Sequence, residues 1–156
     1  MMIIVEGVVA GILAGILMGA ASHVCFMTRL FRSSLIFIDG EFLFRTLNVR
    51  PNDLVRFLVG SVIHLVTSGV FGGIYTAVMH LLALTPLSAL LISTYFFVLW
   101  LSMLFIALPI AGQGLLGKKA GTATWFEQLI LHIIFGAGYY AALATCIRFG
   151  HLIFEF

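Results

Sequence analysis

Two histidines, His64 and His132, are the side chains of this sequence best suited to chemistry, because each lies deep inside a long apolar stretch. Each follows the expected start of its helix by about ten residues, and a helix rises about 1.5 Å per residue. Both imidazoles are therefore expected about 15 Å deep, near the middle of a hydrocarbon layer about 30 Å thick. An ionisable side chain at that depth is costly and is by default a functional hypothesis.

Several roles fit these two histidines. They could ligate the iron of a single haem b, or bind a quinone, as candidate cofactor ligands. They could instead remain neutral and link helices by hydrogen bonds to a nearby hydroxyl or to a backbone carbonyl. The acidic side chains are expected near the membrane surfaces, so neither a hydrolase triad nor a multi-carboxylate metal site can be assembled at the same depth. The sequence therefore predicts neither an enzyme nor a metal centre built from carboxylates. It predicts that the protein binds lipids.

The composition requires that most of the chain contact hydrocarbon. Of its 156 residues, 62% are hydrophobic and 9% are charged, with a mean hydropathy of +1.19. A soluble domain carries roughly 25% charged residues. No basic leader or small-residue cleavage site is found near the start, so the first apolar stretch is expected to stay in the protein. We predict a single all-α membrane domain, 1–156, a four-helix transmembrane bundle with spans at about 3–28, 54–82, 87–111 and 125–147.

A ladder of glycines marks the first span as a packing surface. Gly7, Gly11, Gly15 and Gly19 recur at every fourth position, which places them along one side of a helix. Small residues let helix backbones approach closely in lipid, so a glycine zipper is expected here. The full set of predicted packing glycines is Gly7, Gly11, Gly15, Gly19, Gly69, Gly72 and Gly136.

The basic residues predict the orientation. Seven of the eight Lys and Arg residues fall in or beside the connections after the first and third spans, which lie on the same side of a membrane. The positive-inside rule places these connections in the cytoplasm and both termini outside. A net charge of +2 gives no indication of nucleic-acid binding. Five arginines of the first connection are candidates for topology signals or for contacts with anionic lipid headgroups: Arg29, Arg32, Arg45, Arg50 and Arg56.

The connections carry further expectations. Segment 31–52 mixes apolar and charged residues, which is typical of one or two amphipathic helices lying at the membrane surface, with a break at Gly40. The tight turn at 84–86 predicts that spans 54–82 and 87–111 are antiparallel neighbours. Span 87–111 has many bulky apolar residues and no polar stripe, so it is expected to face lipid or a partner subunit.

The glycine ladder, the run at 64–75 and the glycine-rich turn at 109–117 together resemble small four-span integral membrane proteins of prokaryotes that have no assigned activity. The resemblance implies four helices and a prokaryotic cytoplasmic membrane. From the packing surfaces and the absence of catalytic groupings we expect a small accessory or structural subunit of a larger membrane complex, such as a respiratory or other redox assembly. Its partners would be lipids and other integral membrane subunits, or further copies of this chain. Two alternatives stay open: a mono-haem or quinone-binding protein that uses His64 and His132, and a small transporter or channel.

Overall fold

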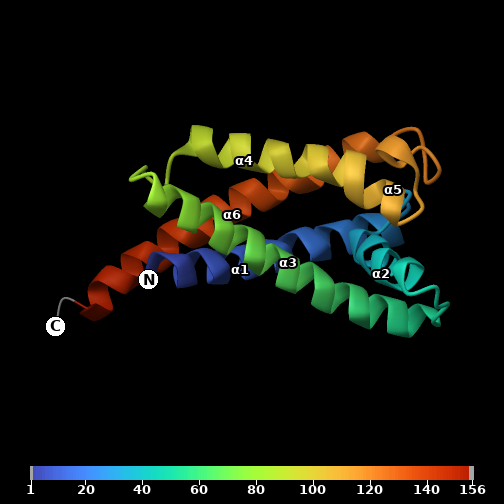
Figure 1. Ribbon diagram of the computed structural model, residues 1–156, viewed down its shortest axis with the longest axis horizontal. Coiled ribbons are helices and arrows are strands. Elements are labelled where there is room, and N and C mark those ends of the chain that lie inside the picture. The colour runs from blue at the N-terminus through green and yellow to red at the C-terminus, as the bar shows by residue number, and fades with distance from the viewer. Residues whose placement is uncertain (1, 155–156) are drawn as a thin grey trace.

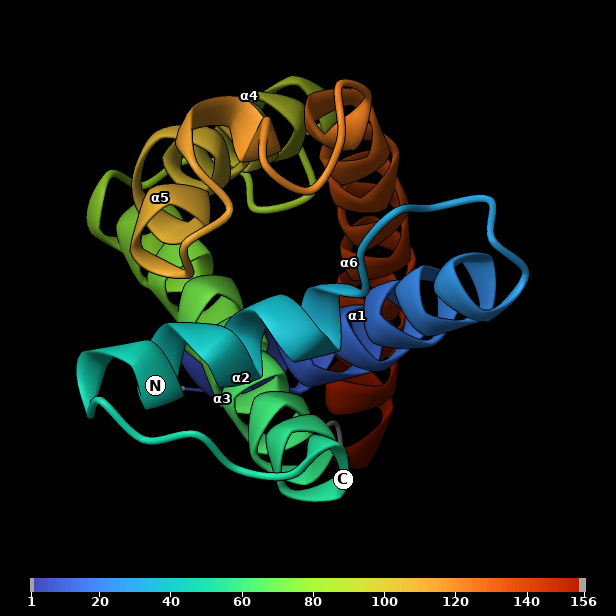
Figure 2. The same cartoon turned by 90° about the vertical axis from the view of Figure 1, so that its right-hand side faces the viewer.

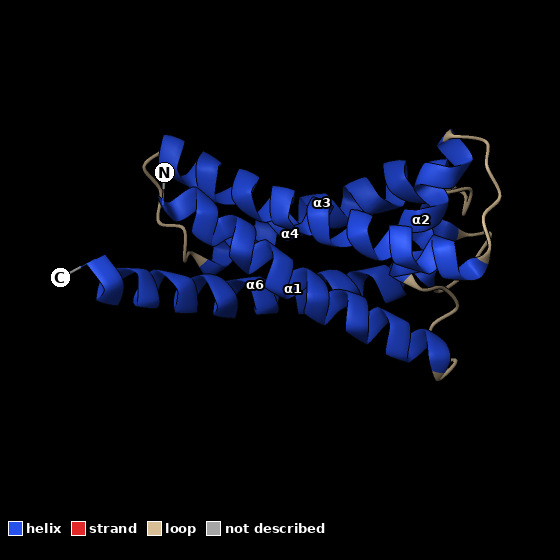
Figure 3. Cartoon of the chain, turned by 90° about the horizontal axis from the view of Figure 1, so that it is seen from below, coloured by secondary structure: helices blue, strands red, loops and turns tan. Residues whose placement is uncertain are grey.

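The computed structural model describes residues 2–154, and every regular element in that range is a helix, with turns and loops between helices and no strand (Figures 1 and 3). Four helices are long and apolar enough to cross a membrane, which confirms the predicted four-helix bundle and identifies the chain as an integral membrane protein. The α-helices are α1 (Met2–Met27), α2 (Leu35–Thr46), α3 (Asp53–Leu81), α4 (Ala89–Ser102), α5 (Leu108–Ile110) and α6 (Thr124–Phe154). A π-helical turn, η1 (Met103–Ala107), joins α4 to α5, and a 3₁₀ turn, η2 (Leu115–Gly117), precedes α6.

The starts of α3 and α4 are set by their sequence. The Asn52 side chain accepts a hydrogen bond of 2.9 Å from the backbone N–H of Val55, and Ser88 accepts one of 3.4 Å from that of Leu91. Such caps satisfy backbone donors that the first turn of a helix leaves free. In Figure 1 the start of α1, the α3–α4 turn and the end of α6 lie at one end of the molecule, and α2 and α5 lie at the other.

Helix α1 forms the centre of the fold by packing against both α3 and α6. Its glycines contact α3 so closely that an added Cβ on Gly11 would lie 3.2 Å from the Cα of Gly69, and closer still to the Ser68 carbonyl. The Tyr139 hydroxyl of α6 completes this contact by donating a 2.8 Å hydrogen bond to the carbonyl of Gly72. Glycines thus allow the backbones of α1 and α3 to touch, as small residues do in membranes. Helix α6 reaches the same place through the Tyr139 side chain.

Helix α2 lies across the ends of α1 and α3 and packs mainly on α3. It is one unbroken helix through Gly40, so the predicted break there is wrong. Gly40 is needed because α2 crosses α3 closely at this point. A Cβ on Gly40 would lie 2.5 Å from the Arg56 carbonyl, and one on Gly60 would lie 2.9 Å from the Gly40 nitrogen. Gly40 therefore serves the approach of α2 to α3, and the helix continues through it.

Helices α3 and α4 meet only near the turn that joins them. There the Tyr75 hydroxyl donates to the Pro86 carbonyl, and the Tyr95 hydroxyl donates to the Phe71 carbonyl, each at 3.0 Å. Beyond this point α4 packs against α6, where a Cβ on Gly136 would lie 3.1 Å from the Phe96 ring. The two spans are antiparallel, as predicted, and contact each other near the turn, but the main partner of α4 is α6. Seen from the α2 end, α4 and α5 lie across the molecule from α1 and α2 (Figure 2).

The π-helical turn η1 ends two residues before Pro109. Pro109 has no N–H to bond the carbonyl four residues earlier, so a regular helix is disfavoured at this position. The backbone N–H of Leu108 bonds to the Met103 carbonyl, which is five residues back and gives the wider π turn. Single π turns of this kind occur often at functional sites. In this chain the turn forms one wall of the cavity described next.

Candidate functional site: a cavity inside the bundle

A cavity of about 380 Å³ lies where α3 and α4 have separated, in the half of the molecule that contains α2. Every major helix contributes to its lining, and Phe42, Phe71 and Phe135 supply aromatic walls. We call it the central cavity. Its polar lining residues are Asp39, His64, Thr67, Ser68, Ser102 and His132.

His64 is buried, and both of its ring nitrogens are engaged. Its Nε2 lies 3.0 Å from the Gly15 carbonyl oxygen, and since a carbonyl only accepts, Nε2 carries a proton and donates. The lack of a side chain at Gly19 gives the ring room, because a Cβ there would lie 3.2 Å from the His64 Cδ2. Gly15 and Gly19 thus contact the imidazole of His64, whereas Gly7 and Gly11 contact the backbone of α3.

The other nitrogen of His64, Nδ1, lies 3.0 Å from Oδ2 of Asp39 on α2. Burial raises the pKa of the Asp39 carboxyl above its ordinary value, and the bond to His64 partly opposes this. One proton therefore lies between the two groups, on either the carboxyl or the imidazole. In both cases the pair carries no net charge.

The sequence does not predict this pair, because segment 31–52 is predicted to lie at the membrane surface, away from the histidines. A signal was present in the spacing. Asp39 follows the apolar Leu35 by four residues and Ile36 by three, so all three share one face of α2. That face packs on the bundle and carries the carboxylate with it.

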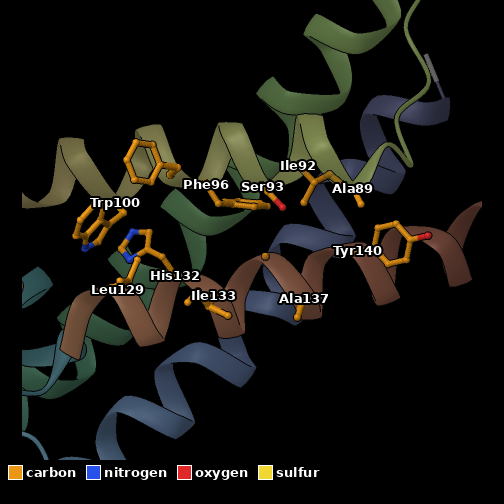
Figure 4. A pocket seen from close by; sticks show the side chains of 12 residues that line it. Ala89, Ile92, Ser93, Phe96, Trp100, Leu129, His132, Ile133, Ala137 and Tyr140 are labelled. Carbon is orange, nitrogen blue, oxygen red and sulfur yellow. The ribbon is translucent and has the colours of Figure 1, made fainter. Parts of the chain in front are cut away.

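His132 lies at the junction of two hollows. Its Nδ1 donates a 2.8 Å hydrogen bond to the Gln128 carbonyl, so Nε2 of the neutral ring is an acceptor, and it makes no hydrogen bond to the described residues. The ring lines the central cavity and also a groove of about 440 Å³ between α4 and α6. Figure 4 shows the ring projecting from α6 toward α4, beside Trp100. The structure thus brings both predicted histidines to one cavity.

These bonds bear on the haem alternative. An iron ligand needs a free ring nitrogen, and His132 has one whereas His64 has none unless it releases Gly15 or Asp39. Haem ligation by both histidines therefore stays a prediction that requires a rearrangement at His64. Within residues 2–154 the structure shows no group of three His, Cys, Asp or Glu side chains arranged to hold a metal ion.

The five predicted surface arginines all lie at the α2 end, but several have protein partners. Arg56 lies 3.4 Å from Glu41 and 3.5 Å from Asp53. The backbone N–H of Arg32 donates to both oxygens of the buried Glu127 at 3.1 and 3.2 Å. The guanidinium of Arg45 lies over Gly112, whose φ of +80° and closeness to that group both disfavour a side chain. The remaining two are exposed at their positions: Arg29 and Arg50.

The fold and the cavity thus define a class, an integral membrane protein of four spanning helices with a mainly apolar cavity in one half of the bundle and a few polar groups in its lining. None of the family models, curated proteins or solved structures compared with the chain matches it.

Proposed function

We propose that this protein binds a small lipophilic molecule in the central cavity, with the polar head of the ligand at Asp39 and His132. The observation that carries the proposal is that these two groups, from different helices, face one apolar, aromatic-lined space. Binding sites for small molecules typically combine apolar walls with a few convergent polar groups. Polar groups kept at membrane depth are expensive and mark ligand or ion sites.

The ligand would enter from the bilayer between α3 and α4. The lining residues on this side are also open to the surroundings, since Phe71 is 39% and Ile106 is 58% exposed, and Thr67 is exposed as well. Phe71 lies where the contact between α3 and α4 ends, and Thr67 and Ile106 line the cavity beyond it. A lateral opening suits a molecule that is dissolved in the membrane.

The proposal includes a location. The basic connections put the α2 end of the molecule in the cytoplasm, with both termini outside, and the resemblance noted above favours a prokaryotic cytoplasmic membrane. The central cavity would then lie in the cytoplasmic half of that membrane.

Filling the cavity tests the proposal. Ala107 lines the cavity on η1, and Ala107→Phe places a ring inside it, whereas Ala141→Phe adds the same ring to an exposed position of α6. Mass spectrometry of small molecules extracted from the purified protein should find a lipophilic compound other than phospholipid in the wild type and in the Ala141→Phe control. The Ala107→Phe variant should lose most of it. Equal recovery from all three proteins, or no such compound in the wild type, would contradict the proposal.

A second candidate is the accessory subunit expected from the sequence. The observation in its favour is the outer face of α4 and η1, where four bulky side chains are more than half exposed: Phe97, Val98, Phe105 and Ile106. Gentle detergent extraction followed by mass spectrometry of co-purifying proteins tests this role. Recovery of the chain alone and folded would contradict it. An absorption spectrum of the same sample tests the haem alternative, since a Soret band lost in His64→Ala would support it.

A further inference from the structure

We infer that the central cavity selects a ligand head that donates hydrogen bonds, and that it binds a hydroquinone in preference to the corresponding quinone. The inference rests on the proposed function and names the chemical class of its ligand. It follows from the direction of each hydrogen bond around the cavity.

Three polar side-chain atoms that line the cavity have no hydrogen-bond partner among the described residues, and two of them can only accept. The Nε2 of His132 is unprotonated in the neutral ring, since Nδ1 donates to Gln128. The free oxygen of Asp39, Oδ1, accepts whether the shared proton lies on the carboxyl or on His64, because Oδ2 is the atom that faces Nδ1. His64 itself has no proton left for a ligand, since Nε2 already donates to Gly15.

The hydroxyl groups of the cavity add little donating capacity. The Thr67 hydroxyl donates to the carbonyls of Ile63 and His64 at 2.8 and 3.0 Å. The Ser102 hydroxyl donates to the Val98 carbonyl at 3.0 Å. The third atom, the Ser68 hydroxyl oxygen, makes no hydrogen bond to the described residues, so its proton is free to donate. Acceptors therefore outnumber free donors, so a head with two hydroxyl groups is complementary and a head with two carbonyl groups is not.

The charge and the walls of the cavity distinguish a hydroquinone from other donors. An alkylammonium head also donates hydrogen bonds, but burying it needs a compensating negative charge. The Asp39–His64 pair has no net charge to offer, because one proton lies between the two groups. The phenyl rings of Phe71 and Phe135, in turn, offer a surface on which a flat aromatic head can pack.

The test compares both redox forms of one short-chain ring compound. Protein in nanodiscs is titrated by calorimetry under anaerobic conditions with a short-chain benzoquinone and with its hydroquinone, and protein-free nanodiscs correct for partition into lipid. The hydroquinone should bind about tenfold or more tightly, the order of effect expected when a buried acceptor is left without a donor. The midpoint potential of the bound couple should then rise by about 30 mV for each tenfold of preference.

The outcomes separate this inference from the proposed function. If both forms bind equally, or the quinone binds more tightly, the inference fails and the cavity remains a binding site. Tighter binding of an alkylammonium of the same chain length would also overturn it. If none of these compounds binds, both the inference and the proposed function fail for this class of ligand.

Variants of His132 identify the acceptor. His132→Phe should weaken hydroquinone binding about tenfold and leave quinone binding unchanged, whereas the same change at His80, which is exposed at the far end of α3, should alter neither. His132→Gln supplies a donor together with an acceptor, so it should retain the hydroquinone and gain affinity for the quinone. If the preference for the hydroquinone persists in folded His132→Phe, or His132→Gln gains nothing for the quinone, the assignment is wrong.

Discussion

At the scale of single residues, the least expected contact is between Asp39 on a surface helix and His64 inside the bundle. The pair is 3.0 Å apart, and the carboxyl is buried enough that its pKa is raised above the ordinary value of 3.8. The folded protein thus holds the proton of Asp39 more tightly than an unfolded chain would. A raised pKa in the folded state stabilises the protein below the unfolded pKa, and this stabilisation is lost as the pH rises through the folded value.

The Asp39 pair therefore predicts a pH dependence of stability. In thermal denaturation of the detergent-solubilised protein, the wild type should lose stability as the pH is raised from about 4 toward neutrality. Asp39→Asn mimics the neutral carboxyl, donates to His64, and should remove this dependence. Asp39→Leu leaves the Nδ1 of His64 without a partner and should cost about 1–3 kcal/mol at acidic pH. A slope that is identical in the wild type and Asp39→Asn would show that another group is responsible.

At the scale of elements, hydropathy predicted the four spans to within two residues at nearly every end, because the length of an apolar helix follows from bilayer thickness. The sequence could not predict which helices pack together. The short turn after α3 predicts that α3 and α4 are antiparallel neighbours, but it does not predict that α4 packs mainly against α6, where Gly136 lies against the Phe96 ring. The sequence also predicts Asp39 at the membrane surface, with the rest of segment 31–52. It does not reveal that α2 packs against α3, because that contact depends on Gly40 and Gly60 lying opposite each other in space.

The close contact of α1 with α3 predicts a contrast between two glycines. A methyl group at Gly11 would collide with the backbone of Ser68, which cannot move without shifting a helix. One at Gly73 would meet the Cγ2 of Val8 at 2.8 Å, and this is a side chain that can adjust. In detergent unfolding experiments, Gly11→Ala should destabilise the protein by about 1–3 kcal/mol. Gly73→Ala should change stability by less than about 1 kcal/mol, since better helix propensity offsets the adjustment. Equal effects would mean that α1 and α3 do not pack as described.

At the scale of the whole molecule, the chain has two unlike ends. The end with α2 carries five of the six arginines, the two lysines of the last connection, and the central cavity. The other end has the α3–α4 turn, the start of α1 and the end of α6. The tyrosines Tyr75, Tyr95 and Tyr139 close the bundle near that turn, with Tyr75 and Tyr139 at a centroid distance of 5.6 Å. The cavity is thus closed toward the termini and bounded at the opposite end by α2, which leaves the bilayer side as its route of access.

The asymmetry of charge predicts which end faces the cytoplasm, and single cysteines can test it. Cys25 and Cys146 are both free, so they are first replaced by serine, and the double variant without new cysteines is the control. Lys118→Cys then marks the α2 end, and Thr85→Cys marks the turn between α3 and α4. In intact cells, a membrane-impermeant maleimide should label Thr85→Cys and spare Lys118→Cys until the membrane is opened, because basic connections stay in the cytoplasm. The reverse pattern would put the central cavity in the outer half of the membrane, and labelling of both variants in sealed cells would contradict a four-span path.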